Sequence, residues 1–158
     1  CPNVARGGMS FGADPVVVER VSSLVRSASS RPFSVKLTPN AGDMTETAMA
    51  ACAGGADAIT VCNTFLGMKV DWRTGRPAMR RGVAGYTSPA LLPLVVASVH
   101  AVSEAVGVPV LASGGVSRAE DLLELMAAGA EMVQVGSLIL RRPGAAGELL
   151  RDARELLR

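Results

Sequence analysis

Short apolar runs alternate with longer segments of helical spacing along most of the chain. Four of the runs have the length and β-branched content of strands. They cover residues 33–37, 58–62, 109–112 and 131–135. Each run is followed by a segment whose apolar residues recur every three or four positions, which is typical of amphipathic helices. Consecutive strand–helix units build a parallel sheet, so the pattern predicts an α/β fold.

Polar residues at the starts of the longer segments predict where the helices begin. Asp14 is a suitable N-cap, and Pro15 is favoured at the first helical position. The expected core face of this helix consists of Val17, Val21, Leu24 and Val25. Asp43 or Thr45 is expected to cap a second helix, which ends at the Gly54-Gly55 pair.

Two further helices are expected downstream. One covers about residues 88–105. The other follows the third strand, with Ser117 as its N-cap and Glu120 in the capping-box position. Glu120, Asp121 and Glu124 are expected to lie on a solvated face of this helix.

The segment between the second strand and the third helix interrupts the strand–helix alternation. Met68, Val70 and Trp72 alternate with polar residues, and Thr74-Gly75 offers a turn. This pattern predicts a short β-hairpin insertion around residues 68–80.

Two architectures accommodate four strand–helix units. One is a small doubly wound sheet, and the other is half of a TIM (β/α)8 barrel, which normally needs about 250 residues. The chain has 158 residues and begins with Cys1 instead of Met, so we expect further residues before it. Glycine turns after the last two strands favour the barrel, because barrels commonly bind phosphate there. We therefore expect the C-terminal part of a TIM barrel, strands 5–8, as one domain over residues 1–158.

Composition argues against several classes of partner. The net charge is only +2 and the basic residues are scattered, so no nucleic acid is expected. The apolar runs are too short for a membrane span. Three cysteines, Cys1, Cys52 and Cys62, have no metal-ligand spacing, so we expect no metal. Free thiols are typical of a cytoplasmic protein.

The candidate chemistry lies at the ends of the predicted strands. Gly114-Gly115 and Gly136-Ser137 each open a helix after a strand, and together they could hold one phosphate on backbone N–H groups. By alternation, Lys36 points away from the apolar side of its strand, and inside an enclosed barrel it would need an anion. Asn63-Thr64 suits hydrogen bonding to a planar polar ligand, or is simply a polar strand end.

Several of these segments together resemble one family. They are Cys1-Pro2-Asn3, residues 35–40, Asn63-Thr64 with Gly67, residues 113–116 and residues 135–137. In their order and spacing they resemble the dihydroorotate dehydrogenases, from Cys1 to about Arg142. The resemblance implies a barrel that binds flavin mononucleotide (FMN) and oxidises dihydroorotate to orotate in pyrimidine (UMP) biosynthesis.

The resemblance also implies roles for individual residues. Cys1 would be the base that removes the C5 proton of dihydroorotate while hydride leaves C6 for the flavin. The pyrimidine ring would be bound by Asn3, Asn63 and Thr64. FMN would be bound by Lys36 beside the ring, by Cys62 and Ser88 near it, and by Gly114, Gly115, Gly136 and Ser137 at the phosphate.

Within the family, the chain is most similar to the soluble class 1 and to its class 1B catalytic subunit. That branch passes electrons to NAD through a partner subunit with FAD and an iron–sulfur cluster, and a homodimer is expected as well. Two positions depart from the family pattern. The family usually has Gly where this chain has Ser88, and Lys where it has Leu92. A positive φ at position 88 would strain a serine.

Two alternatives remain beside this interpretation. One is a related flavoprotein dehydrogenase that acts on another dihydropyrimidine. The other is a non-redox, phosphate-binding barrel enzyme, which a flavin absorbance band would exclude.

Overall fold

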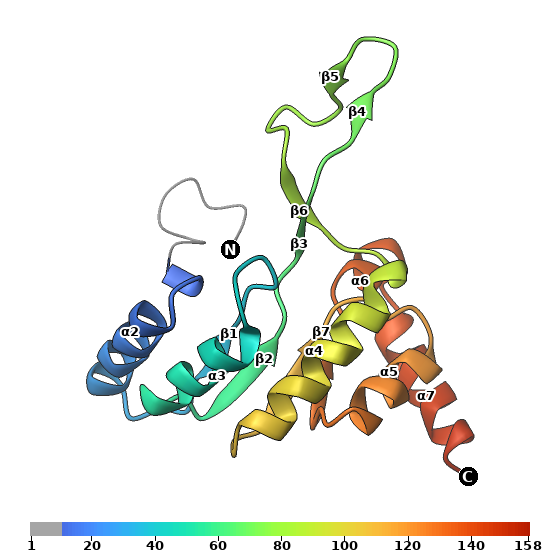
Figure 1. The fold of residues 1–158 in the computed structure, drawn as a ribbon. Coiled ribbons are helices and arrows are strands. Elements are labelled where there is room, and N and C mark those ends of the chain that lie inside the picture. The colour runs from blue at the N-terminus through green and yellow to red at the C-terminus, as the bar shows by residue number, and fades with distance from the viewer. Residues whose placement is uncertain (1–10) are drawn as a thin grey trace.

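A parallel β-sheet forms the centre of the molecule in the computed structural model, which describes residues 11–158. Cys1 and Asn3 therefore lie outside the described residues. The strands are β1 (Ser34–Lys36), β2 (Ala58–Val61), β7 (Val110–Ser113) and β8 (Met132–Gln134). They lie in the order β1-β2-β7-β8, and each pairs in parallel with the next. Figure 1 labels the first three of these strands. The predicted strands are confirmed to within two residues at each end.

Helices connect the strands and form a row beside the sheet. They are α2 (Pro15–Ala28), α3 (Met44–Ala53), the 3-10 turn η1 (Pro89–Leu91), α4 (Leu92–Ala105), α5 (Ala119–Ala127), α6 (Ser137–Arg141) and α7 (Ala145–Leu156). Contacts run from α2 to α3, α4, α5 and α7 in turn, as the row in Figure 1 shows. Because each connection advances by one strand and such crossovers are right-handed, the connecting helices cover one face of the sheet.

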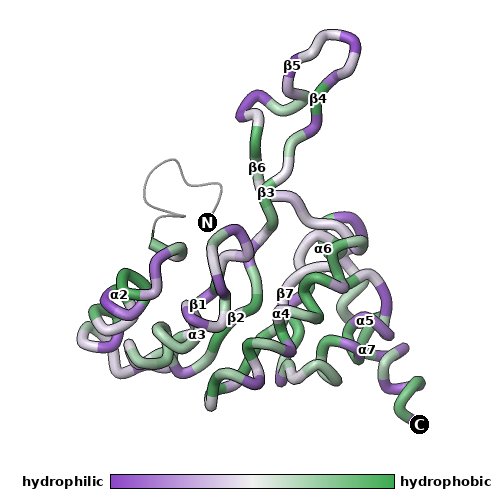
Figure 2. The backbone as a smooth tube through the Cα atoms, viewed as in Figure 1, coloured by the Kyte–Doolittle hydropathy of each residue, from purple (hydrophilic) through white to green (hydrophobic). Residues whose placement is uncertain are grey.

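The two faces of the sheet differ in burial, most clearly at the edge strands β1 and β8. Ile59, Val61 and Ala112 point toward the helices and are fully buried. On the opposite face, Lys36 is exposed and Met132 is 59% exposed. Figure 2 shows the hydrophilic edge strand β1 beside the hydrophobic β2. The core therefore lies between the sheet and the helices, and the other face is open among the described residues.

The helix caps follow the sequence in two cases. The Asp14 carboxylate accepts a hydrogen bond from the Val16 N–H at 2.9 Å and begins α2. Asp43 accepts from the Thr45 N–H at 2.8 Å and begins α3, so Asp43 is the cap and Thr45 is not. Both bonds satisfy a backbone donor that has no partner within the helix.

The buried face of α2 differs from the predicted one. Val18 and Ser22 are buried, whereas Val21, Leu24 and Val25 are exposed. A Cβ on Gly54 would lie only 2.5 Å from the Ser22 Cβ. Small residues at the crossing of α2 and α3 therefore decide which side of α2 packs, and the apolar periodicity does not.

The start of α5 also corrects a prediction. Its N-cap is Arg118, not Ser117, and the residue that closes the capping box is Asp121, not Glu120. Asp121 is only 4% exposed, so its assignment to a solvated face was wrong. Glu120 and Glu124 are exposed as expected. Asp121 is buried because it accepts hydrogen bonds from the loop before the helix.

A narrow two-tiered arm projects from the sheet between β2 and α4 (Figure 1). At its base β3 (Phe65–Gly67) pairs antiparallel with β6 (Ala84–Tyr86), and further out β4 (Val70–Asp71) pairs with β5 (Arg76–Pro77). The outer pair confirms the predicted hairpin. Among the described residues, no helix has the length and apolar character to cross a membrane.

Candidate active site

A cavity of about 190 Å³ opens where the four parallel strands end. Eight of the predicted site residues line it: Lys36, Cys62, Asn63, Thr64, Gly114, Gly115, Gly136 and Ser137. They come from the carboxyl ends of all four strands, where parallel α/β folds place their sites. Ser88 is not among the lining residues, and Cys1 and Asn3 lie outside the described residues.

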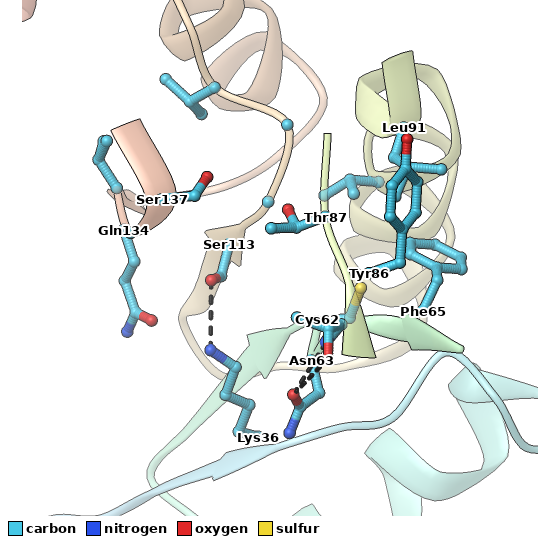
Figure 3. Close-up of a pocket in the computed structure, with 17 residues that line it drawn as sticks. Lys36, Cys62, Asn63, Phe65, Tyr86, Thr87, Leu91, Ser113, Gln134 and Ser137 are labelled. Carbon is cyan, nitrogen blue, oxygen red and sulfur yellow. Dashed lines mark hydrogen bonds between the residues drawn. The ribbon is translucent and has the colours of Figure 1, made fainter. Parts of the chain in front are cut away.

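Lys36 reaches across the cavity toward the end of β7. Its Nζ donates a hydrogen bond to the Ser113 hydroxyl at 3.2 Å (Figure 3). The side chain lies on the open face as strand alternation predicted, but it is exposed and not enclosed. Lys36 forms no ion pair with another described residue. The cavity thus carries an uncompensated positive charge.

Asn63 and Thr64 form the polar end of β2. The Asn63 Oδ1 accepts from the Thr64 N–H at 2.8 Å, and the Asn63 N–H donates to the Leu37 carbonyl at 2.8 Å. With its oxygen engaged in this way, the Asn63 amide retains its NH₂ group for a ligand. The Thr64 hydroxyl lies beside it and can donate or accept.

Asn40 holds this strand end in place. Its Nδ2 donates to the Thr64 carbonyl at 2.9 Å, and its Oδ1 accepts from the Leu66 N–H at 2.8 Å. Only one orientation of the amide satisfies both bonds. The loop after β1 is therefore pinned to the loop after β2, at the base of the arm.

The turn after β7 requires glycine at two consecutive positions. Gly114 has a φ of +129° and Gly115 a φ of +81°, which side chains rarely adopt. A Cβ at Gly115 would also lie 2.8 Å from the Leu92 Cα. Leu92, which departs from the family pattern, is itself buried against this turn. The backbone of the turn therefore packs directly on the start of α4.

The turn after β8 is less constrained. Gly136 has a φ of −108°, and a Cβ there would meet no atom within 4 Å. Ser137 is the first residue of α6. Both residues line the cavity, and Ser137 lies across it from Tyr86 and Thr87 (Figure 3). Space in front of Gly136 is therefore open to a ligand.

Ser88 takes a different place from the one expected. Its φ of −161° is extended, so a serine fits without strain and the expected conflict with the backbone does not arise. Its hydroxyl accepts from the Ala90 N–H at 3.3 Å and caps η1. Within the described structure, Ser88 positions the start of this turn instead of lining the cavity.

Cys62 is buried at the back of the cavity. Burial raises the pKa of its thiol to about 11, and the nearby Lys36 charge only partly opposes this. Near neutral pH the group is a protonated thiol. Among the described residues, no three His, Cys, Asp or Glu side chains come together as a metal site requires.

Sequence reasoning missed several lining residues. Tyr86 and Thr87 come from the end of β6, and Ser113 and Gln134 from the ends of β7 and β8. The alternation of side chains along β8 could have identified Gln134, because it places Gln134 on the same open face as Met132. The position of Tyr86 depends on the pairing of β3 with β6, which no local pattern predicts.

These features define an α/β protein with a polar, cationic ligand site at the carboxyl end of a parallel sheet. The family model for dihydroorotate dehydrogenase matches residues 1–157, and the chain belongs to this family. The resemblance read from the sequence motifs is confirmed.

Two curated relatives illustrate the similarity. The catalytic subunit of dihydroorotate dehydrogenase B (NAD(+)) from Bacillus pumilus is 40% identical over 99% of this chain and 51% of its own length. Dihydroorotate dehydrogenase A (fumarate) from Lacticaseibacillus paracasei is 47% identical over 87% of this chain and 47% of its own. The chain thus spans about half the length of these relatives.

A solved structure supports the fold. The dihydroorotate dehydrogenase of Eimeria tenella, determined in complex with ferulenol, superimposes with a TM-score of 0.72 over 95% of this chain and 45% of that one. The sequences are 18% identical, so this likeness concerns the α/β fold alone.

Proposed function

We propose that the protein is an FMN-dependent enzyme that oxidises dihydroorotate to orotate in pyrimidine biosynthesis. The observation that carries the proposal is the cavity of this family member, which combines one unpaired lysine, a polar strand end and two glycine-containing turns. A cation and backbone donors suit an anionic cofactor, and the amide and hydroxyl of Asn63 and Thr64 suit a pyrimidine.

The chain would form the C-terminal half of a single TIM barrel, strands 5–8, over residues 1–158. The sequential strand order, helices on one face and the open opposite face support this arrangement. Apolar residues left exposed on the open face and on α2, such as Met132 and Leu24, suit contact with further strands and helices. A doubly wound sheet would instead reverse its strand order and carry helices on both faces.

The residues present suit FMN. The N–H groups of Gly115 and Val116 donate to no other described residue, so they are free for a phosphate. Gly136 and Ser137 would complete the phosphate site. Lys36 would place its charge beside the flavin ring, where it stabilises negative charge. When bound, FMN supplies the acceptor for the hydride that leaves C6 of dihydroorotate.

The substrate would be held and deprotonated by side chains of this chain. The Asn63 NH₂ group and the Thr64 hydroxyl would bind polar groups of the ring, together with Asn3. Cys1 would take the C5 proton as a thiolate, which requires that the site favours proton loss from its thiol. The thiol of Cys62 would stay protonated, and Cys62 would contact the flavin only through its backbone.

Partners form part of the same proposal. Several relatives are named catalytic subunits of an NAD(+) enzyme, which supports an electron-transfer partner subunit that carries FAD and an iron–sulfur cluster. We also propose a homodimer in the cytoplasm, where the free thiols Cys52 and Cys62 would stay reduced.

The test uses the purified protein in its full natural length, loaded with FMN and kept free of oxygen. Dihydroorotate is added and the flavin absorbance is followed for the parent, a Cys1→Ala variant and a Lys69→Ala control on the arm. Fast bleaching in the parent and control, with bleaching about 10²- to 10⁴-fold slower in Cys1→Ala, would support substrate and base together. A flavin that stays oxidised with dihydroorotate but bleaches with another dihydropyrimidine would favour the related dehydrogenase. Failure to bind any flavin would favour the non-redox enzyme.

A further inference from the structure

Asp121 is a buried carboxylate that the proposed reaction does not use. It lies in the first turn of α5, and the residue is 4% exposed. Its Oδ2 accepts from the Ser117 N–H at 2.8 Å, from the Ser117 hydroxyl at 2.8 Å and from the Arg118 N–H at 3.1 Å. Its Oδ1 accepts from the Arg118 Nε at 3.1 Å. One carboxylate thus binds two consecutive residues of the loop after β7.

These bonds divide the N–H groups of the loop into two sets. Those of Ser117 and Arg118 are taken by Asp121 and are not available to a ligand. Those of Gly115 and Val116 have no acceptor among the described residues, and both residues line the cavity. Any anion bound by this loop is therefore restricted to its first half.

The first half of the loop depends on its neighbours for its conformation. Two glycines with positive φ are adjacent there, and such residues lose the most conformational freedom when they are ordered. The close approach of Gly115 to Leu92 restrains one side. Asp121 restrains the other side, because it anchors the two residues that follow Val116.

We propose that Asp121 is a positioning residue that holds the Gly114–Val116 backbone in the conformation that binds the phosphate of the cofactor. This inference rests on the proposed function. It assigns to Asp121 a share in the preference for a phosphorylated flavin, although its side chain faces the loop and does not line the cavity. The ionised form suits this role: burial disfavours the charge, yet the bonds from Ser117 and Arg118 outweigh it and lower the pKa of the carboxyl.

The test compares FMN with riboflavin, which has the same ring system but no phosphate. Dissociation constants are measured by flavin fluorescence for the protein in its full natural length, for Asp121→Asn and for Glu120→Gln. Glu120 is an exposed neighbour on the same turn and serves as the matched control. Asp121→Asn should weaken FMN about 10- to 100-fold, as expected for the loss of hydrogen bonds to a charged group, and change riboflavin less than about threefold. Glu120→Gln should change neither.

Ser117→Ala gives a milder second variant if Asp121→Asn folds poorly. It removes only the hydroxyl bond to Asp121 and should weaken FMN a few-fold without affecting riboflavin. Equal weakening of both flavins, or no change in FMN binding, would overturn the inference and leave Asp121 as a cap of α5. If the parent protein binds FMN no more tightly than riboflavin, the phosphate site itself fails, and the proposed function fails with it.

Discussion

A methyl group at Gly115 would test how tightly the turn after β7 packs on α4. In Gly115→Ala the new Cβ would lie 2.8 Å from the Leu92 Cα and 2.9 Å from its N and Cβ. Two of these atoms belong to the backbone, so they cannot move aside as a side chain does. The alanine would also have to adopt a φ near +81°, which is unfavourable for any residue with a Cβ.

The expected loss of stability combines these two effects. A positive φ costs an L-residue about 1–2 kcal/mol, and overpacking of a tight contact costs about 1–3 kcal/mol. Gly115→Ala should therefore lower the free energy of unfolding by about 2–5 kcal/mol. Gly75 is a matched control, because its φ is +66° but a Cβ there would meet nothing within 4 Å. Gly75→Ala should lose only about 1–2 kcal/mol.

Urea unfolding followed by circular dichroism measures both variants against the parent protein. Linear extrapolation gives each free energy of unfolding, and the difference between the two variants isolates the contact with Leu92. Equal losses in Gly115→Ala and Gly75→Ala would refute the close packing of the turn on α4. A full loss of folding in Gly115→Ala alone would agree with it, since total stabilities are only about 5–15 kcal/mol.

Three further predictions concern single side chains. Cys62, with a pKa of about 11, should react with iodoacetamide at pH 8 roughly 100-fold more slowly than a free cysteine, and mass spectrometry after timed quenching checks this. Asn40→Asp keeps the bond from the Leu66 N–H but cannot donate to the Thr64 carbonyl. Urea unfolding should therefore show a free energy of unfolding lower by about 1–3 kcal/mol. An unchanged midpoint would contradict this prediction. The Asp121 carboxyl has a folded-state pKa below its ordinary value of 3.8, so its stabilisation is full above about pH 4 and is lost as the pH falls through the folded-state pKa. The difference in unfolding free energy between the parent and Asp121→Asn should shrink in this acid range, and a difference independent of pH would exclude the charge as its source.

Much of the local structure was predictable from residues close together in the chain. Asp14 and Asp43 each cap a helix through a bond to a residue two positions away. Such signals need no distant partner, so the strand–helix alternation and the hairpin were predicted correctly. The sequence also predicted that Lys36, Asn63 and the glycine turns lie close together, because parallel strands bring their carboxyl ends to one edge of the sheet.

The sequence by itself therefore determined the order of elements, the α/β class, the family motifs and eight of the residues around the cavity. The tertiary structure alone decided that Val18 and Ser22 form the buried side of α2, since α3 offers its close approach there. It also decided that Ser88 has extended backbone and that Asp121 is buried against the loop that follows β7. From sequence alone, a charged residue such as Asp121 is predicted to be solvent-exposed. Only the spatial positions of the groups that donate hydrogen bonds to it show that it is buried.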